Sequence, residues 1–157
     1  MDIEREAPDG SAPAPAASPA RAAAWLAKQV ELALATVDLS LPQYRVLSLL
    51  DEGSAISSAL AERLAVRPPS VTAVVDGLVA RELVTRHQVD GDRRRISLVL
   101  TPAGRRLLAL ADAAADERLA TLLDCLEGPG ARGRALNGLD LWRQAMATRR
   151  QRVAAAR

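Results

Sequence analysis

Three consecutive arginines, Arg93, Arg94 and Arg95, follow the turn-forming pair Asp90-Gly91. Each guanidinium presents several N–H donors in a rigid fork, which suits it to binding phosphate. Residues 57–106 hold nine arginines against five acidic residues, a net charge of +4, whereas residues 1–56 carry −4. Because the positive charge gathers on one stretch, we expect a phosphate-binding surface there. A solvated charged face is the alternative.

Catalytic and metal-binding chemistry has few candidate residues. His87 is the single histidine and Cys125 the single cysteine, which excludes a His-x-x-x-His zinc site, an intramolecular disulfide and a cysteine cluster. A nucleophile–histidine pair would have to use His87, which lies in the basic stretch and is expected to bond backbone or phosphate. Asp116 and Glu117 are adjacent on a predicted helix and therefore point to different faces. We expect no enzyme, no metal and no cofactor.

Cys125 also bears on redox regulation. A reactive thiol needs exposure and a nearby positive charge or helix N-terminus. Cys125 instead lies near the end of a predicted long helix, beside Asp124 and close to Glu127. These neighbours favour a small packing residue, with an oxidant-sensing Cys125 as the alternative.

The length and composition predict one globular domain. The chain has 157 residues, of which 49% are hydrophobic, 25% charged and only 2% aromatic, so the core must be aliphatic and mostly helical. Apolar runs stay below the roughly 18 residues that a membrane span needs, and the acidic N-terminus has no signal-peptide pattern. Together with the lone cysteine, these features predict a cytoplasmic location without membrane contact.

The N-terminal third predicts a tail followed by two helices. Residues 1–19, rich in Pro and Ala, are expected to be disordered. Apolar residues at spacings of three and four predict an amphipathic helix over residues 20–37. Ser40 and Gln43 form the pattern of a capping box, so a second helix should begin there and end near Gly53.

The next segment predicts a helix-turn-helix over residues 57–80. Ser57 and Ser58 are candidate caps for a helix over residues 59–66, and Pro68-Pro69 can open another that continues to residue 83. In a helix-turn-helix the second helix enters the DNA major groove, although two packed helices of any small bundle would give the same pattern. The short side chains that could then approach base edges are Pro69, Ser70, Thr72 and Ala73.

The remaining sequence predicts a hairpin and two helices. Alternating apolar residues indicate two strands within residues 83–101, joined at Asp90-Gly91. Thr101 can cap a long helix of about seven turns that carries apolar residues as far as Leu126. A final helix over residues 132–152 places its large apolar side chains, Leu136, Leu139, Trp142 and Met146, on one face. The fold class is therefore α+β, mostly helical, with a winged helix-turn-helix.

Residues 39–106 contain the segments LSLPQYRVLSLL, ALAERLAVRPPSVTAVVDGLVARELVTR and DGDRRRISLVLTPAG. Together these three segments resemble the MarR family of bacterial transcriptional regulators. The resemblance implies one domain over residues 20–152 that forms a homodimer through the helices of residues 20–37 and 102–152. It also implies a wing arginine in the DNA minor groove and control by small, often aromatic, molecules.

The resemblance carries over to particular residues. Residues 67–73, beginning at Arg67, match the start of the family's recognition helix, and Asp76 and Leu78 match its later half. Asp92 and Arg94 match the Asp-x-Arg element of the wing.

We expect Arg94 in the minor groove, held there by Asp92, with Arg93 or Arg95 on phosphate. The chain departs from the family pattern at three positions: Ala73 and Gly77 stand where basic residues are common, and Glu82 replaces a glycine.

The expected function is that of a homodimeric repressor, released from a pseudo-palindromic operator in double-stranded DNA by a small-molecule effector. The second helix borders the effector cleft in the family, so Tyr44 is a candidate effector contact, with core packing as the alternative. Trp25 and Trp142 are expected to pack in the core or between subunits. A winged-helix protein-interaction module without DNA binding is the rival interpretation.

Overall fold

The computed structural model describes residues 18–53, 55–64, 68–89 and 92–155, so the predicted tail lies outside it as far as residue 17. The elements in chain order are α1 (Pro19–Ala35), α2 (Leu41–Asp51), β1 (Ala55–Ile56), α3 (Ser57–Leu64), α4 (Pro68–Ala80), β2 (Val84–Val89), β3 (Asp92–Leu100), α5 (Pro102–Leu123) and α6 (Ala131–Ala155). The predicted helices and hairpin are all present. The fold is mostly helical with a small sheet, as expected.

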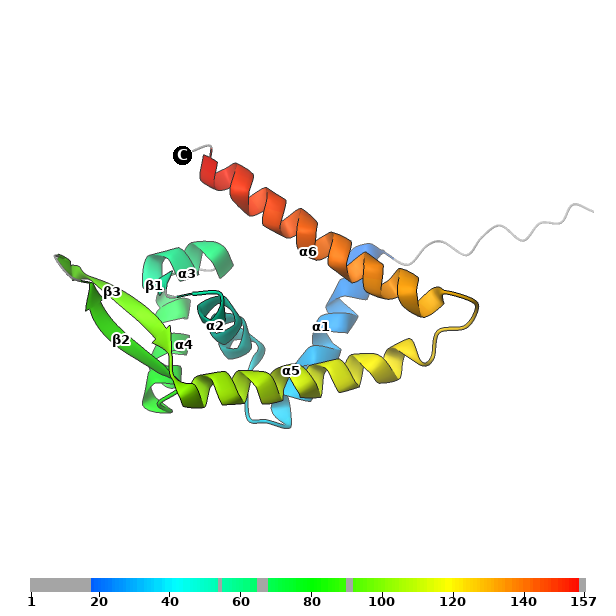
Figure 1. Ribbon diagram of the computed structural model, residues 1–157, viewed down its shortest axis with the longest axis horizontal. Helices are drawn as coiled ribbons and strands as arrows, with labels where there is room; N and C mark the ends of the chain where they lie inside the picture. Colours follow the sequence, from blue (N-terminus) through cyan, green and yellow to red (C-terminus); the bar gives the residue numbers. More distant parts are fainter. Residues whose placement is uncertain (1–17, 54, 65–67, 90–91, 156–157) are drawn as a thin grey trace, which may run out of the picture.

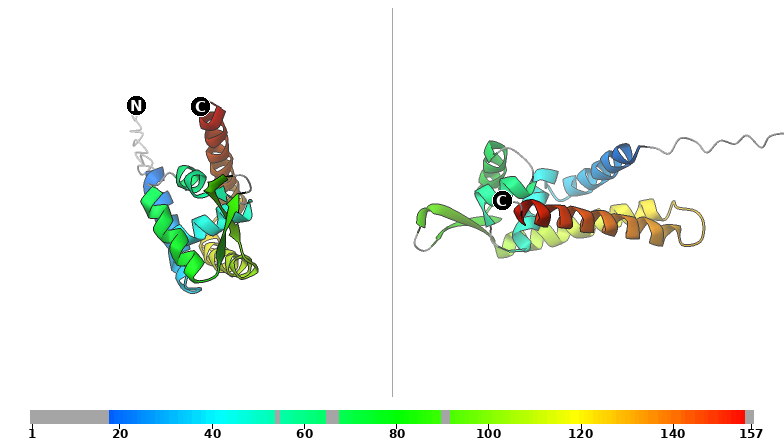
Figure 2. Two further views of the ribbon diagram at one scale, coloured as in Figure 1. Left: turned by 90° about the vertical axis from the view of Figure 1, so that its left-hand side faces the viewer. Right: turned by 90° about the horizontal axis from the view of Figure 1, so that it is seen from above.

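The molecule is elongated. The helix-turn-helix and the sheet lie at one end, α5 leads away from them, and α6 turns back in the opposite direction (Figure 1). Helix α1 packs on α5 and also touches α2. The strands β2 and β3 extend beyond the helices as a wing, which Figure 2 shows from two further directions.

The sheet has three strands in the order β1-β3-β2, with both pairings antiparallel. Strands β2 and β3 lie within the predicted residues 83–101. Strand β1 was not predicted, because two residues are too few to show the alternation that marks a strand. It joins the connection before α3 to the inner half of the wing through the pairs Ala55–Leu98 and Ile56–Ser97.

Two predicted helix starts are confirmed by their caps. The Ser40 hydroxyl accepts from the Gln43 amide at 3.4 Å, while the Gln43 side chain accepts from the Ser40 amide at 3.0 Å. The Thr101 hydroxyl accepts from the Gly104 amide at 2.9 Å. The start of α5 also packs tightly, since an ideal Cβ at Gly104 would lie 2.1 Å from the Leu83 carbonyl oxygen.

The core is aliphatic, as predicted from the composition. Its largest side chains, each less than 2% exposed, come from α1 to α4 and from the two wing strands: Leu34, Val46, Leu47, Leu60, Val75, Leu78, Val84, Leu98 and Leu100. The winged helix therefore encloses its own core. By contrast, no described residue of α6 is buried.

Helices α1 and α4 end in the same way. In each, a non-glycine residue adopts a left-handed conformation, with φ +53° at Asp38 and +57° at Glu82. The next amide bonds back to the last turn, from Leu39 to Leu34 at 3.1 Å and from Leu83 to Leu78 at 3.0 Å. This is the Schellman pattern, in which glycine is the usual residue at the left-handed position.

Three predicted helix boundaries need correction. Helix α4 ends at Ala80 rather than continuing to residue 83, because Glu82 has left the helical conformation. Helix α5 ends at Leu123, so Leu126 lies beyond it. Helix α3 begins at Ser57, so its expected caps, Ser57 and Ser58, lie inside it.

Candidate nucleic-acid interface

The outward face of α4 carries the predicted base-contacting residues. Val71, Val75 and Leu78 are buried at helical spacing, which anchors α4 against the core. The predicted base contacts described in α4 are exposed and lie in the first turns of the helix: Pro69, Ser70, Thr72 and Ala73. Arg67 lies outside the described residues. The local geometry thus presents a narrow surface of short side chains, which allows close approach of another molecule.

Asp76 lies one turn beyond Thr72 on this same face. Its carboxylate forms an ion pair with Arg86 of β2, and both side chains are partly exposed. The pair joins α4 to the wing and offsets a negative charge that would otherwise lie beside the short side chains. The sequence prediction did not single out Arg86, although the spacing of Thr72 and Asp76 would have shown an acid on the outward face.

The wing tip contains a bulge at the arginine cluster. Gln88 pairs with Ile96, but the next residue of β2, Val89, pairs with Asp92. The three intervening residues of β3 are therefore the predicted arginines, Arg93, Arg94 and Arg95. A bulge bends its strand and redirects the side chains that it carries. For Asp92 and these arginines the description covers the backbone alone, so their contacts stay a prediction.

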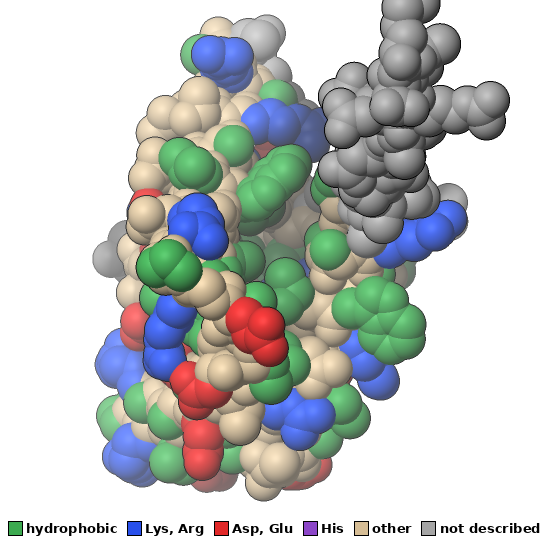
Figure 3. Space-filling view, turned by 90° about the vertical axis from the view of Figure 1, so that its right-hand side faces the viewer, with side chains coloured by type: hydrophobic (Ala, Val, Ile, Leu, Met, Phe, Trp, Pro, Cys, Tyr) green, Lys and Arg blue, Asp and Glu red, His purple; other side chains and the backbone are tan. Residues whose placement is uncertain are grey.

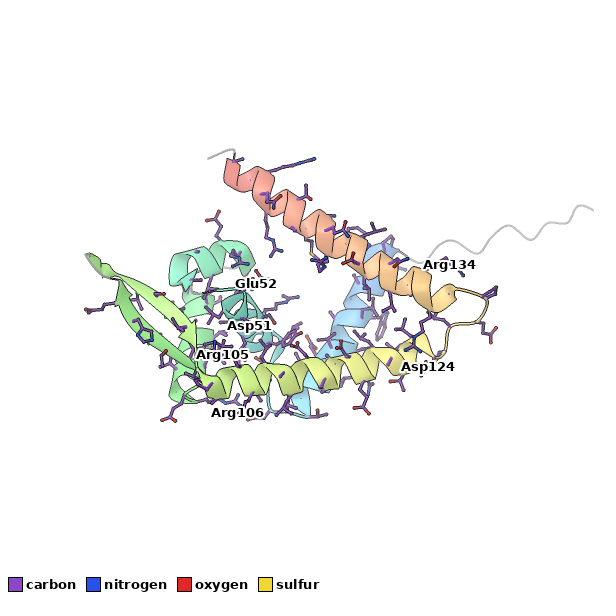
Figure 4. The ribbon with its side chains drawn as sticks, viewed as in Figure 1. Asp51, Glu52, Arg105, Arg106, Asp124 and Arg134 are labelled. Atoms are coloured by element: carbon purple, nitrogen blue, oxygen red, sulfur yellow. The ribbon has the colours of Figure 1, made fainter. Side chains whose placement is uncertain are left out.

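Further arginines lie at the base of the wing. Arg105 and Arg106 occupy the first turn of α5, both exposed and without an ion-pair partner among the described residues (Figure 4). At the end of α2, Asp51 is exposed, whereas Glu52 pairs with Arg63 of α3. Arg105 and Arg106 thus add positive charge directly after the point where β3 leads into α5.

Comparisons with known proteins bear directly on this arrangement. The model of the MarR family matches residues 37–95, from the connection between α1 and α2 to Arg95 of β3. The transcriptional repressor CouR, solved bound to a 23-mer DNA duplex, is 31% identical with a TM-score of 0.66, over 78% of this chain and 87% of that one. The chain belongs to the MarR family.

Two other relatives extend the match. A MarR-family transcriptional regulator from Rhodococcus sp. RHA1 is 25% identical with a TM-score of 0.69, covering 82% of this chain and 88% of that one. The uncharacterized HTH-type transcriptional regulator YhbI of Bacillus subtilis is 34% identical over 82 residues, or 52% of this chain. This chain spans about half of that curated relative's length, 53%.

CouR from Rhodococcus jostii RHA1 has also been solved with p-coumaroyl-CoA, with a TM-score of 0.65 and 25% identity, over 82% of this chain and 87% of that one.

Tyr44 of this chain is half-buried against the core, and its hydroxyl donates to Asp112 of α5 at 2.6 Å. Burial and this hydrogen bond raise the pKa of Tyr44 to about 12. Tyr44 therefore stays protonated and links α2 to α5.

A small cavity of about 170 Å³ lies between α2, α3 and α4, with Val46, Leu64, Ser70 and Val74 among its walls. Tyr44 lies outside its lining. The cavity reaches Ser70 at the N-terminal end of α4, so a molecule bound in it would contact the first turn of that helix.

His87 has a side-chain partner within the wing, and the expected packing of Cys125 needs correction. His87 Nε2 lies 2.9 Å from the Thr85 hydroxyl, so its described partner is a side chain of the same strand rather than backbone. Cys125 is exposed just beyond α5, with Sγ 3.4 Å from the Thr121 carbonyl oxygen, and so does not pack in the core of one chain. Among the described residues, neither a candidate metal cluster nor a helix able to cross a membrane is found.

Proposed function

We propose that this MarR-family chain is a DNA-binding transcriptional regulator. The observation that carries the proposal is the Asp76–Arg86 ion pair, which joins the outward face of α4, with its exposed short side chains, to strand β2 of the wing. The other strand of the wing, β3, carries the three-arginine bulge. Helix α4 would enter the major groove, with Thr72 and Ala73 at base edges. Arg94, positioned by Asp92, would enter the minor groove, while Arg93 or Arg95 binds phosphate.

The proposed active form is a homodimer. Large apolar side chains lie along one face of α6 and are exposed to solvent. The exposed fraction is between 43% and 65% for Leu136, Leu139, Trp142 and Met146. Trp25 of α1 is 70% exposed, and hydrophobic side chains gather around a hollow on this end of the molecule (Figure 3). Exposed apolar surface of this kind marks an interface. A twofold axis would place the two α4 helices about one DNA turn, roughly 34 Å, apart.

The proposed mode of control is repression relieved by a small, possibly aromatic, molecule. CouR is a repressor solved with DNA and with p-coumaroyl-CoA, which supports this assignment by similarity. The Tyr44–Asp112 contact between α2 and α5 is the candidate point at which an effector would act.

We assign this chain no catalytic role and no cofactor, a single winged-helix domain over residues 20–152, and the cytoplasm as the compartment in which it meets DNA.

Binding to the upstream region of its own gene tests the function. Fluorescence anisotropy should give tighter binding to that region than to a shuffled duplex, with an affinity that falls as salt rises. Arg94→Ala should reduce the preference for that region, whereas Arg132→Ala, in the first turn of α6, should leave it unchanged. Equal and negligible binding to both duplexes would favour the protein-interaction module.

Oxidant control through Cys125 is a second candidate, favoured by the exposure of its thiol. The thiol lies just beyond the C-terminal end of α5, with its Sγ 3.4 Å from the Thr121 carbonyl oxygen, and not at the helix N-terminus that commonly activates a cysteine. We therefore expect the wild type and Cys125→Ser to bind DNA equally in low peroxide. Release of DNA by the wild type alone would establish oxidant control.

A further inference from the structure

Helix α4 contains neither lysine nor arginine, and its outward face includes an acid, Asp76. A helix that lies in the major groove runs between the two phosphate backbones of the duplex. Contacts to these phosphates supply a large share of the affinity for DNA and come chiefly from arginine and lysine. In the proposed function, the cations that hold α4 against a duplex must therefore come from the elements beside it.

Two different elements flank the outward face of α4. Helical periodicity places Asp76 on one flank and Ser70 with Gly77 on the other. The first flank meets the wing, because Asp76 pairs with Arg86 of β2. The second flank meets α2, since an ideal Cβ at Gly77 would lie 3.8 Å from Nε2 of Gln43. A phosphate backbone beside this second flank would therefore face α2.

Arg45 is the cation that α2 brings to this flank. It is exposed and, together with Ser70 and Val74 of α4, lines the cavity of about 170 Å³ between α2, α3 and α4. Arg45 thus lies beside the first turns of α4, at the edge of the surface of short side chains. A duplex bound to that surface would bring one of its backbones to Arg45.

Arg45 also differs from its neighbours in its partners. Each of the other arginines described between α2 and β2 forms an ion pair with an acid: Arg63 with Glu52, Arg81 with Asp38, and Arg86 with Asp76. Within the described part of the chain, Arg45 has no such partner. A guanidinium without a carboxylate keeps its full charge and its forked N–H donors for phosphate.

We propose that Arg45 is a further phosphate-binding residue, which holds the α2 flank of α4 against one DNA backbone while the wing holds the other flank. The inference rests on the proposed function, in which α4 enters the major groove. A phosphate is the same at every base pair, so this contact carries no sequence information. Arg45 thus supplies affinity and orientation, and the short side chains of α4 read the bases.

Anisotropy titrations at several salt concentrations test this role, with the duplex from the upstream region and a shuffled duplex of equal length. Each phosphate contact contributes about 0.9 to the slope of log affinity against log salt, so Arg45→Gln should make the slope shallower by about two in a homodimer. At about 50 mM salt, affinity for both duplexes should fall by at least about tenfold. The ratio of the two affinities should stay constant.

Two further variants separate the contact from a general loss of charge. Arg45→Lys keeps a positive charge on a flexible stem and should retain most of the wild-type slope. Arg132→Gln is the matched control, because it removes the same charge from the first turn of α6, where Arg132 pairs with Asp124. Its slope and affinity should equal those of the wild type.

NMR gives a second readout that needs no change in the wild-type chain. The Nε–H signal of Arg45, assigned by its loss in Arg45→Gln, should shift when the duplex is added. An unmoved signal, an unchanged slope in Arg45→Gln, or an equal loss of slope in Arg132→Gln would overturn the role of Arg45 and leave the proposed function standing. Weaker binding of Arg45→Gln to the upstream duplex alone would also overturn it, because Arg45 would then read a base. A wild type that binds neither duplex would overturn the proposed function itself, and the role of Arg45 with it.

Discussion

The winged helix and α6 differ in where their apolar side chains lie. From α2 to β3 most of the large aliphatic residues described are buried, with Leu47, Leu60, Leu78 and Leu98 fully enclosed. In α6 no described residue is buried, and Trp142 is 65% exposed. Both segments show helical spacing of apolar residues, yet only one finds partners within its own chain. The same pattern thus predicts burial without saying which molecule supplies the covering surface.

Leu78→Ala should have the largest effect on folding. Leu78 is fully buried on the inner face of α4, so truncation leaves a cavity between α4 and the rest of the core. We expect the free energy of unfolding to fall by about 2–5 kcal/mol in urea denaturation. A loss below about 1 kcal/mol would mean that the core relaxes around the site, and the contrast between the two regions would weaken.

Trp142→Ala should affect association rather than folding. An aromatic residue at the centre of an interface contributes about 2–4 kcal/mol to binding, so the dimer should dissociate at higher protein concentration. Leu141→Ala is the control, because Leu141 is equally exposed at 64% but points away from the face of Leu139 and Met146. Analytical ultracentrifugation showing equal dissociation constants for the two variants would remove α6 from the interface.

Arg86→Ala tests whether the wing offsets an acid on α4. Loss of Arg86 leaves the Asp76 carboxylate facing phosphate, and operator binding should weaken by about 1–3 kcal/mol. The double variant Arg86→Ala/Asp76→Ala should regain most of this loss in anisotropy titrations. A double variant as weak as Arg86→Ala would indicate instead that Arg86 contacts DNA directly.

Glu82→Gly should have the smallest effect and the opposite sign. Glu82 has φ +57°, and glycine relieves this strain, so the free energy of unfolding should rise by about 1 kcal/mol. Glu82→Ala removes the charge but keeps the strained conformation, and its urea midpoint should stay near that of the wild type. If Glu82→Ala were also more stable than the wild type, the gain in stability would come from loss of the Glu82 charge.

Local chemistry made much of the fold predictable. Ser40 with Gln43 and Thr101 with Pro102 mark helix starts that the structure confirms, because a capping residue acts within four positions of itself. Strand β1 escaped prediction because it depends on pairing with β3, more than forty residues later. Glu82 ends α4 in a conformation that its residue type does not favour, so the helix was predicted too long.

The candidate interface likewise has some features that the sequence predicts and others that only the structure shows. The exposed positions of α4 follow from helical periodicity, and the basic character of the wing follows from counting charges. The Asp76–Arg86 and Asp38–Arg81 pairs join separate elements, and charge patterns along the chain do not reveal such partners. Tyr44 was a candidate effector contact by resemblance, but its bond to Asp112 spans 68 residues and required the structure.

The exposed apolar face of α6 makes the behaviour of the protein depend on how much of the chain a cell contains. In the proposed homodimer a second copy covers this face, so folding and association would be linked by mass action and the melting temperature would rise with total chain concentration. Where monomer predominates, the amount of dimer grows with the square of that concentration. A modest fall in synthesis would then vacate the operator more than proportionally, so that the cellular copy number of the chain becomes a regulatory input of its own.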